Sequence, residues 1–435
     1  MPLNCFTVRR VILLLLMLTT TSCTDVPSRP ASSSTAAARM VARPPFQLPG
    51  IALDTIASGL SVPWALAFAP DGRIFVTERV GRIRVIEAQG LRAEPWATLG
   101  VHADEEGIWP ESGLMGIALA PDFAQTGHLY VMGTFRKRGL AGGERKIDRL
   151  YRRMVGLFSE TGSLRFENRV YRLTDRGGRG QQRELVIAGL PANHYHAGGA
   201  LTFGPDGKLF VSNGEALISA HAQNRNDLVG KILRYMPDGS IPNDNPFPGS
   251  PVFAYGTRNV QGLAWEPRTS ALFAIDHGPT FLPHEGGRSG KDELNLIGAG
   301  ANLGWPIAAG IGNDTAFVNP VTEWSPAIAP GGLAFYLGSH LPWRNNAFIG
   351  GLRGHQLRRV AIEQTAGSTE WRVTEQAIEI SQVLGRIRAV AMGPDGFLYI
   401  TTSNRDGRGV PAPTDDLLLR VRPLGPATAT NRNPG

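Results

Sequence analysis

The chain has 435 residues, of which 42% are hydrophobic, so it can bury one large core or two smaller ones. Its formal net charge of +7 comes mainly from arginine, because lysine occurs only at positions 137, 146, 208, 231 and 291. This charge suits anionic ligands, yet the sequence has no basic run interleaved with aromatic residues, no zinc-finger spacing and no helix-turn-helix pattern, so no nucleic-acid partner is expected.

The N-terminal segment predicts an exported protein. Arg9 and Arg10 precede the apolar run VILLLLMLTT, which is too short to span a membrane comfortably and is typical of a signal-peptide core. The residues that lead into Cys23 resemble a bacterial lipoprotein box, with Thr20 where that motif prefers leucine. We therefore expect a signal peptide over residues 1–22, a lipid anchor at Cys23 as the single membrane contact, and residence in the periplasm or on the cell envelope. The alternative is an ordinary secretory peptide that is cleaved later and discards Cys23.

The segment after the signal peptide is predicted to be a tether. Residues 23–45 are rich in serine, alanine, proline and threonine, a composition typical of flexible linkers. Removal of the signal peptide would also remove Cys5, so the mature chain would hold at most one cysteine and no internal disulfide. We expect one folded domain over residues 46–424 and a disordered tail over residues 425–435.

The folded domain contains a segment that recurs six times. Each copy has a short alternating apolar run, a turn and a second alternating run, and the copies begin at Leu66, Gly116, Leu201, Gly262, Gly332 and Val390. Pro-Asp-Gly turns favour hairpins, because proline fixes φ, aspartate caps the backbone and glycine adopts positive φ. The copies start roughly 50 to 85 residues apart, which is compatible with four-stranded blades. The sequence therefore predicts an all-β fold, a six-bladed β-propeller of four-stranded antiparallel blades; a pair of β-sandwiches is the alternative.

Five segments carry a resemblance to a known family. They read VPWALAFAPDGRIFVTERVGRIRVI, GKILRYMPDGSIPNDNPF, FAYGTRNVQGLAW, DELNLIGAGANLGWP and IAPGGLAFY. In this order, within about residues 60 to 419, they resemble the soluble aldose dehydrogenases that use pyrroloquinoline quinone (PQQ), the glucose/sorbosone dehydrogenase family. The resemblance implies a six-bladed propeller with the quinone over the channel and a calcium ion touching it.

The resemblance makes His196 the candidate catalytic residue. The segment HAGGALTF places His196 just before an inner strand, where the family has its histidine base. An imidazole there can take the proton of a sugar's anomeric hydroxyl while hydride leaves for the quinone. The alternative is a histidine that only completes a turn beside Gly198 and Gly199. His194 has no counterpart in the family and is expected to be dispensable.

The resemblance also assigns the cofactor ligands. PQQ carries three carboxylates on a flat ring, and the arginine fork matches carboxylate geometry. The residues matched to quinone-binding positions are Glu111, Arg258, Asn259, Gln261, Arg353, Arg386 and Arg388. The alternative is that these arginines are ordinary solvated surface residues.

Calcium is expected beside the quinone. This hard cation takes oxygen ligands, commonly carbonyls supplemented by a carboxylate. The matched positions would supply the carbonyls of His277, Gly278, Pro279 and Leu303 and the carboxylate of Asp292.

Several positions depart from the family pattern. Glu111 replaces the usual glutamine and would cost quinone affinity unless a cation compensates its charge. Glu215 replaces an aspartate, and Ala200 and Thr257 replace a common arginine and histidine. The segment GPTFLPHEGGRSG is longer than in many relatives and is expected to alter the rim of the channel.

The resulting expectation is an exported PQQ- and calcium-dependent dehydrogenase. Its small-molecule substrate would be an aldose sugar or a related alcohol or aldehyde, and the sequence does not identify the electron acceptor. Two alternatives belong to other classes: a non-catalytic binding propeller, as in animal signalling proteins of this family, and a calcium-dependent lactonase-type propeller. His196, the arginines and Asp292 together favour the enzyme.

Overall fold

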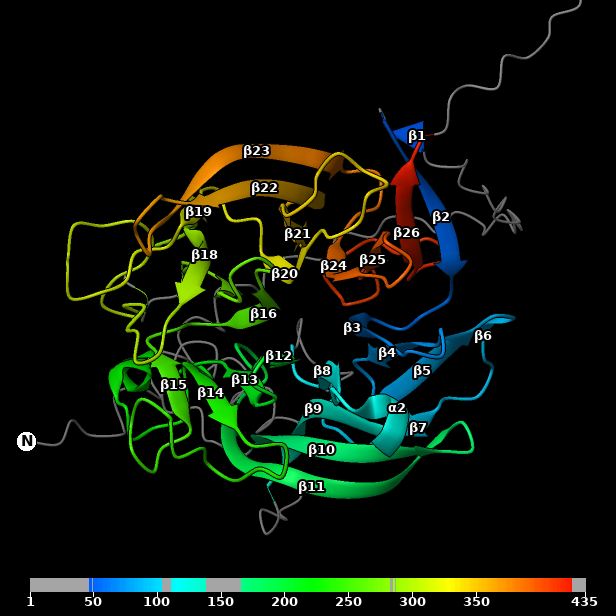
Figure 1. Cartoon of the computed structure of the whole chain (residues 1–435), viewed down its shortest axis with the longest axis horizontal. Helices are drawn as coiled ribbons and strands as arrows, with labels where there is room; N and C mark the ends of the chain where they lie inside the picture. The colour runs from blue at the N-terminus through cyan, green and yellow to red at the C-terminus, as the bar shows by residue number, and fades with distance from the viewer. Residues whose placement is uncertain are drawn as a thin grey trace, which may run out of the picture. The chain divides into compact units, whose positions relative to one another are not determined.

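The computed structural model describes residues 47–48, 50–103, 111–137, 166–281, 285 and 287–424. Its strands form six antiparallel sheets around a central axis (Figure 1). The prediction of a six-bladed propeller is confirmed, and the β-sandwich alternative is wrong. The expected signal peptide, Cys23, the tether and the expected tail lie outside the described residues. Within the described part, no helix is long and apolar enough to cross a membrane.

The first three blades follow one another along the chain. Each begins with its inner strand and adds strands outward. The first blade consists of β3 (Pro63–Phe68), β4 (Ile74–Glu78), β5 (Arg82–Glu87) and β6 (Gly90–Leu91), with β7 (Ala97–Thr98) also paired to β5. The second consists of β8 (Leu114–Leu119), β9 (His128–Arg136), β10 (Phe166–Arg176) and β11 (Arg179–Ala192), and helix α2 (Phe123–Thr126) joins β8 to β9. The third consists of β12 (Gly198–Phe203), β13 (Leu209–Asn213), β14 (Lys231–Tyr235) and β15 (Val252–Tyr255), and the 3-10 helix η1 (Ser219–Gln223) precedes β14.

The last three blades close the ring. The fourth consists of β16 (Val260–Trp265), β17 (Leu272–Asp276), β18 (Asp292–Ile297) and β19 (Thr322–Trp324). The fifth consists of β20 (Pro330–Phe335), β21 (Ala347–Gly351), β22 (Gln356–Gln364) and β23 (Trp371–Ser381). The sixth takes β24 (Ile387–Met392), β25 (Leu398–Thr402) and β26 (Leu418–Pro423) from the C-terminal part and β2 (Ile51–Ala57) from the N-terminal part, with β1 (Gln47–Leu48) at its edge.

The sixth blade joins the two ends of the propeller. Strand β2 pairs antiparallel with β26, with Leu53 opposite Val421, and Figure 1 shows the two strands side by side. The carboxylate of Asp54 accepts hydrogen bonds from Arg420 (3.0 Å) and Arg422 (2.8 Å) across this pair. This pairing closes the ring, because the N-terminal and C-terminal parts of the chain share the sixth blade.

Local turn chemistry explains the hairpins between inner and second strands. In each Pro-Asp-Gly turn the aspartate Oδ1 accepts the backbone N–H two residues later, and the glycine adopts positive φ. The aspartates are Asp71, Asp206 and Asp395, and the glycines are Gly72, Gly207 and Gly396, with φ of 88°, 73° and 83°.

Apolar side chains that alternate along the strands hold neighbouring blades together. Met115 of the second blade and Leu201 of the third belong to one buried cluster, and Phe348 of the fifth and Leu398 of the sixth belong to another. Burying each such side chain contributes about 1.5–3 kcal/mol. The inner strands surround a channel of 490 Å³.

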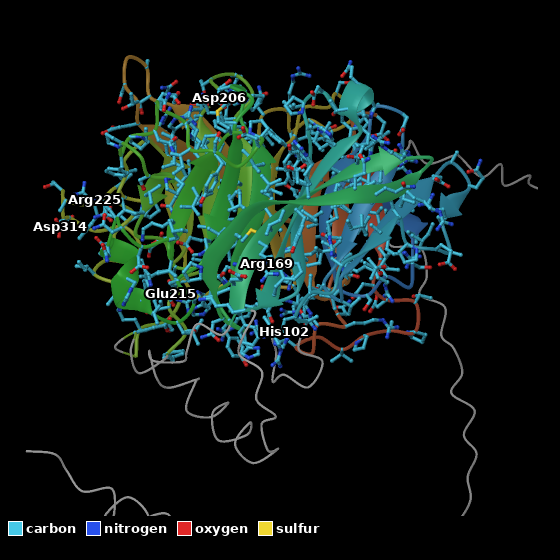
Figure 2. All side chains as sticks on the ribbon, turned by 90° about the horizontal axis from the view of Figure 1, so that it is seen from below. His102, Arg169, Asp206, Glu215, Arg225 and Asp314 are labelled. Atoms are coloured by element: carbon cyan, nitrogen blue, oxygen red, sulfur yellow. The ribbon has the colours of Figure 1, made fainter. Side chains whose placement is uncertain are left out.

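The inner strands approach one another closely around this channel. A Cβ atom on Gly116 would lie only 2.4 Å from the carbonyl oxygen of Gly199 on the next blade, so only glycine fits there. All six inner strands begin at the same face, and the loops that precede them meet there. In Figure 2, Glu215 lies toward this face and Asp206, in a Pro-Asp-Gly turn, lies toward the opposite one.

Candidate active site

The backbone of His196 is held in an unusual conformation at the mouth of the channel. His196 is 6% exposed and has a φ of +52°, which is uncommon for a residue with a side chain. Its N–H donates to Glu111 Oε2 (3.0 Å) and its carbonyl accepts the N–H of Ala216 (3.1 Å). A Cβ atom on Gly214 would lie 2.0 Å from the same carbonyl oxygen. Glu111, Ala216 and Gly214 therefore fix where the His196 ring points.

The His196 ring lies between a carboxylate and a guanidinium. Its Nδ1 is 2.6 Å from Glu215 Oε1, and its Nε2 is 3.0 Å from Arg258 Nη2. Arginine can only donate, so Nε2 accepts the hydrogen bond from Arg258. The ring proton is then on Nδ1, which donates a hydrogen bond to Glu215. Trp305 Nε1 donates to the other Glu215 oxygen at 2.5 Å. The structure thus presents a neutral imidazole with its bare Nε2 directed at Arg258.

Glu215 stays ionised although it is fully buried. Burial alone would raise its pKa, but the hydrogen bond from His196 and the charge of Arg258 lower the pKa to about 2. An ionised partner on Nδ1 orients the imidazole and stabilises the imidazolium that forms when Nε2 gains a proton. Glu215, which replaces the family's aspartate, therefore still reaches His196.

Arg258 is fixed by both its backbone and its side chain. The N–H groups of Arg258 and Asn259 donate to the two oxygens of Asp276 at 2.8 and 2.6 Å. Burial raises the pKa of this Asp276 carboxyl to about 6, although the two N–H donors act in the opposite direction. The Arg258 guanidinium pairs with Glu285 and also donates to the carbonyl of His277 (3.4 Å).

Glu111 and Asn259 join the second and fourth blades. Asn259 Nδ2 donates to Glu111 Oε2 (2.9 Å), and Asn259 Oδ1 accepts the N–H of Gly198 (3.0 Å). Burial would raise the pKa of Glu111, but Arg408, 3.3 Å from its Oε1, and the hydrogen bond from the His196 N–H hold the pKa well below the usual range. Arg408 is thus the cation that compensates the glutamate.

Arginines gather on the sixth-blade side of the site. Arg386 Nε donates to Asp406 Oδ2 (2.7 Å). Arg388 donates to Ser403 Oγ (3.0 Å) and Gln261 Oε1 (3.2 Å), and its guanidinium lies 4.0 Å from the centre of the Trp64 ring. Burial lowers the pKa of Arg388 to about 10.

The charges of this cluster fit a flat polyanion. The arginines outnumber the carboxylates, since Arg79, Arg386, Arg388 and Arg408 share the region with Asp406, Asp416 and Glu111. The planar guanidinium of Arg388 and the Gln261 amide are suited to the carboxylates and ring oxygens of PQQ. Arg353 differs from the other predicted ligands because it is exposed.

The predicted calcium residues form a turn held by Asp292. Asp292 Oδ1 accepts the N–H of Gly278 (2.8 Å), while Oδ2 accepts those of Ile328 (2.6 Å) and Ala329 (2.7 Å). A Cβ atom on Gly278 would lie 2.0 Å from the carbonyl of Gly290, so the turn requires glycine. Asp292 therefore ties the segment of His277, Gly278 and Pro279 to the start of β20.

The donor set at this turn suits calcium through carbonyl oxygens. Among the residues that the structure describes, no group of three or more histidine, cysteine, aspartate or glutamate side chains could hold a metal. Calcium accepts backbone carbonyls readily, so this finding is compatible with the predicted set, in which Asp292 orders the carbonyls as well as offering its own charge. Leu303, the other predicted ligand, is buried, and its N–H bonds the carbonyl of Tyr255 (2.9 Å).

His194 lies beside the site with a different environment. Its ring contacts the rings of His102 (5.2 Å between centres) and Phe166 (4.6 Å). Its carbonyl accepts the N–H groups of Glu111 (2.8 Å) and Ser112 (3.2 Å), a contact that any residue could make.

Several site residues escaped the sequence analysis. They are Trp305, Asp276, Glu285, Ser403, Asp406 and Arg408. The SNRDGRG segment, which follows the last Pro-Asp-Gly repeat and holds three of them, was the available signal. Glu285 lies in the long GPTFLPHEGGRSG segment, which was noted only for its length.

Comparison with known proteins identifies the family of the chain. The family model described as glucose/sorbosone dehydrogenase matches residues 60–419. The chain belongs to the glucose/sorbosone dehydrogenase family. It is 32% identical to the aldose sugar dehydrogenase of Escherichia coli, over 85% of this chain and 92% of that protein. It is 27% identical to quinoprotein glucose dehydrogenase B of Acinetobacter calcoaceticus, over 80% of this chain and 84% of that one.

The chain is also similar to a solved structure. The PQQ-bound form of the aldose sugar dehydrogenase from Streptomyces coelicolor is 32% identical to this chain and matches it with a TM-score of 0.68. The match covers 87% of this chain and all of the other. The fold of this chain is therefore similar to that of a PQQ-bound aldose sugar dehydrogenase over most of its length.

Proposed function

We propose that this protein is an exported dehydrogenase that oxidises an aldose sugar, or a related alcohol or aldehyde, at its anomeric hydroxyl with PQQ as cofactor. The observation that carries the proposal is the buried His196–Glu215 pair, whose unprotonated Nε2 faces a site rich in arginine. Family membership and the PQQ-bound relative support the cofactor.

Arg386, Arg388 and Arg408 would hold the PQQ carboxylates together with Gln261, and Arg258 and Asn259 would contact its other edge. The carbonyls of His277, Gly278, Pro279 and Leu303, with Asp292, would hold calcium. When bound, PQQ supplies the hydride acceptor and calcium polarises it.

His196 would perform the proton transfer. The sugar loses a hydride from its anomeric carbon and a proton from the hydroxyl, and Nε2 of His196 takes the proton. The hydroxyl displaces the Arg258 hydrogen bond from Nε2 as it enters. Glu215 stabilises the resulting imidazolium through Nδ1, and Glu111 keeps the ring in place through the His196 backbone.

An assay of purified apo-protein tests the proposal directly. Reduction of a dye acceptor by aldoses is measured with neither addition, with PQQ alone, with calcium alone and with both. We expect turnover with both additions and little with calcium alone. Tight sugar binding without dye reduction under any condition would favour a non-catalytic propeller, and lactone hydrolysis with calcium alone would favour a lactonase.

A further inference from the structure

The long loop after β17 brings a buried carboxylate to Arg258. Glu285 of this loop is 1% exposed. Its Oε1 accepts a hydrogen bond from Arg258 Nε (2.7 Å) and lies 2.6 Å from Nη2 in an ion pair, so two atoms on one edge of the guanidinium contact the carboxylate. A two-point contact fixes the plane of the guanidinium as well as its position.

Glu285 is itself held firmly by the loop. Its Oε2 accepts the N–H of Thr280 (2.6 Å). Its carbonyl accepts Arg288 Nε (2.9 Å), and Arg288 Nη2 donates to the carbonyl of Pro306 (2.8 Å). The Arg288 guanidinium also lies 5.4 Å from the Trp305 ring, and Trp305 donates to Glu215. The loop is therefore connected to both partners of His196.

From this geometry we infer that Glu285 is a positioning residue that orients the Arg258 guanidinium so that Nη2 meets Nε2 of His196. This inference rests on the proposed function, because it gives His196 the role of base. Without Glu285, the buried Arg258 charge would lack its ion-pair partner and would turn toward another carboxylate. Its charge already acts on Glu215, whereas Asp276 already accepts two backbone N–H groups. Arg258 would then compete with His196 for Glu215, and the ring would lose its fixed orientation.

The test compares Glu285→Gln and Glu285→Ala with wild type and with a matched control, Glu266→Gln. Glu266 is also a fully buried carboxylate paired with an arginine, Arg268 at 2.6 Å, but it follows β16 at the face opposite the site. The first measurement uses apo-protein with ¹⁵N-labelled histidine, and the His196 ring signals are assigned by their loss in His196→Gln. Wild type and the control should show one tautomer, with the proton on Nδ1, and both Glu285 variants should show a mixture.

The second measurement is turnover per bound quinone. Misplacement of the base by about an ångström costs on the order of 10²-fold in rate, so Glu285→Ala should lose about that factor in kcat with little change in KM, and Glu285→Gln less. Lower melting temperature and quinone affinity with unchanged ring signals and unchanged kcat would overturn the inference, as would increased kcat. If wild type itself shows no turnover, the proposed function fails, and the apo-protein spectra alone decide whether Glu285 orients the pair.

Discussion

The ring of His196 has two features that a turn-forming histidine would not need, and its backbone is in the left-handed region. Its Nδ1 bonds an ionised carboxylate, and its Nε2 carries no proton. A left-handed residue with a side chain costs free energy and persists only where its surroundings impose it. The surroundings here are Glu111 and Gly214, which hold the backbone on both sides.

Replacing His196 should therefore remove turnover without removing the fold. We expect His196→Gln and His196→Ala to lose on the order of 10²- to 10⁴-fold in kcat, with near-normal quinone affinity and melting temperature. His194→Ala should keep most turnover, because its ring packs on His102 and Phe166 outside the base pair. Turnover per bound quinone distinguishes the two histidines, and unchanged kcat in the His196 variants would rule out the base.

Glu215 should make the free energy of unfolding depend on pH in the acidic range. Its ordinary pKa is 4.5 and its folded pKa is about 2, so the unfolded state binds the proton first as pH falls. The ionised form thus stabilises the fold fully above pH 4.5, by about 3 kcal/mol, and this contribution disappears as pH falls through 2. The difference in unfolding free energy between wild type and Glu215→Gln should be largest at neutral pH and shrink below 4.5. A difference that does not vary with pH would contradict this assignment.

At the scale of elements, the loop between β13 and η1 has no room for a side chain at Gly214. Gly214→Ala would place a methyl group 2.0 Å from the His196 carbonyl, so His196 must shift. We expect on the order of 10²-fold loss of turnover, as for other small displacements of a catalytic group.

Gly207→Ala is the matched control in the same blade. Gly207 lies in a Pro-Asp-Gly turn and has a φ of +73°. A Cβ atom at this position would have no other atom within 4 Å. This variant should lose about 1 kcal/mol of stability through backbone strain and keep its turnover. Equal turnover in the two glycine variants would show that the His196 backbone tolerates displacement.

The sequence predicted those elements that are determined by residues close together in the chain. Pro-Asp-Gly turns and alternating runs specify each hairpin from neighbouring residues, so the six blades and the positions of His196, Arg258 and Arg386 before inner strands were predictable. The ring closure by β2 was not, because its partner β26 lies at the other end of the chain. Trp305, Glu285 and Arg408 were missed for the same reason: their loops reach His196 only after the blades assemble. The chemistry assigned to these residues remains a prediction.

At the scale of the whole molecule, one carboxylate beside the predicted calcium site joins two blades. Asp292 begins β18 and its carboxylate holds residues just before β20, so it links the fourth and fifth blades at the turn of Gly278. We expect chelation of wild type to release both calcium and quinone, and Asp292→Asn to weaken both affinities, because the carbonyls lose their orientation and the site loses a charge. Calorimetry with each ligand measures this. If quinone affinity is the same with and without chelator, calcium has no role in quinone binding.

The N-terminal segment is expected to decide where the molecule resides. If Cys23 is lipidated, wild type should partition into the detergent phase and Cys23→Ala into the aqueous phase, since the lipid chains are the expected membrane contact. Phase partitioning of protein expressed with its own signal peptide measures this. Aqueous partitioning of both proteins would contradict the anchor and leave secretion by an ordinary signal peptide.

The pairing of β2 with β26 also sets the order of events during synthesis. Asp54 and Arg422 bond across 368 residues, so the edge of β2 that faces away from β1 has no partner until β26, the last strand, exists. Contacts this distant in sequence form late and slow the folding step that depends on them. A chain halted anywhere before β26 would carry β2 as a bare edge, ready to pair with other unfinished chains. Export before folding would let the whole ring close at once, after the last residue has crossed.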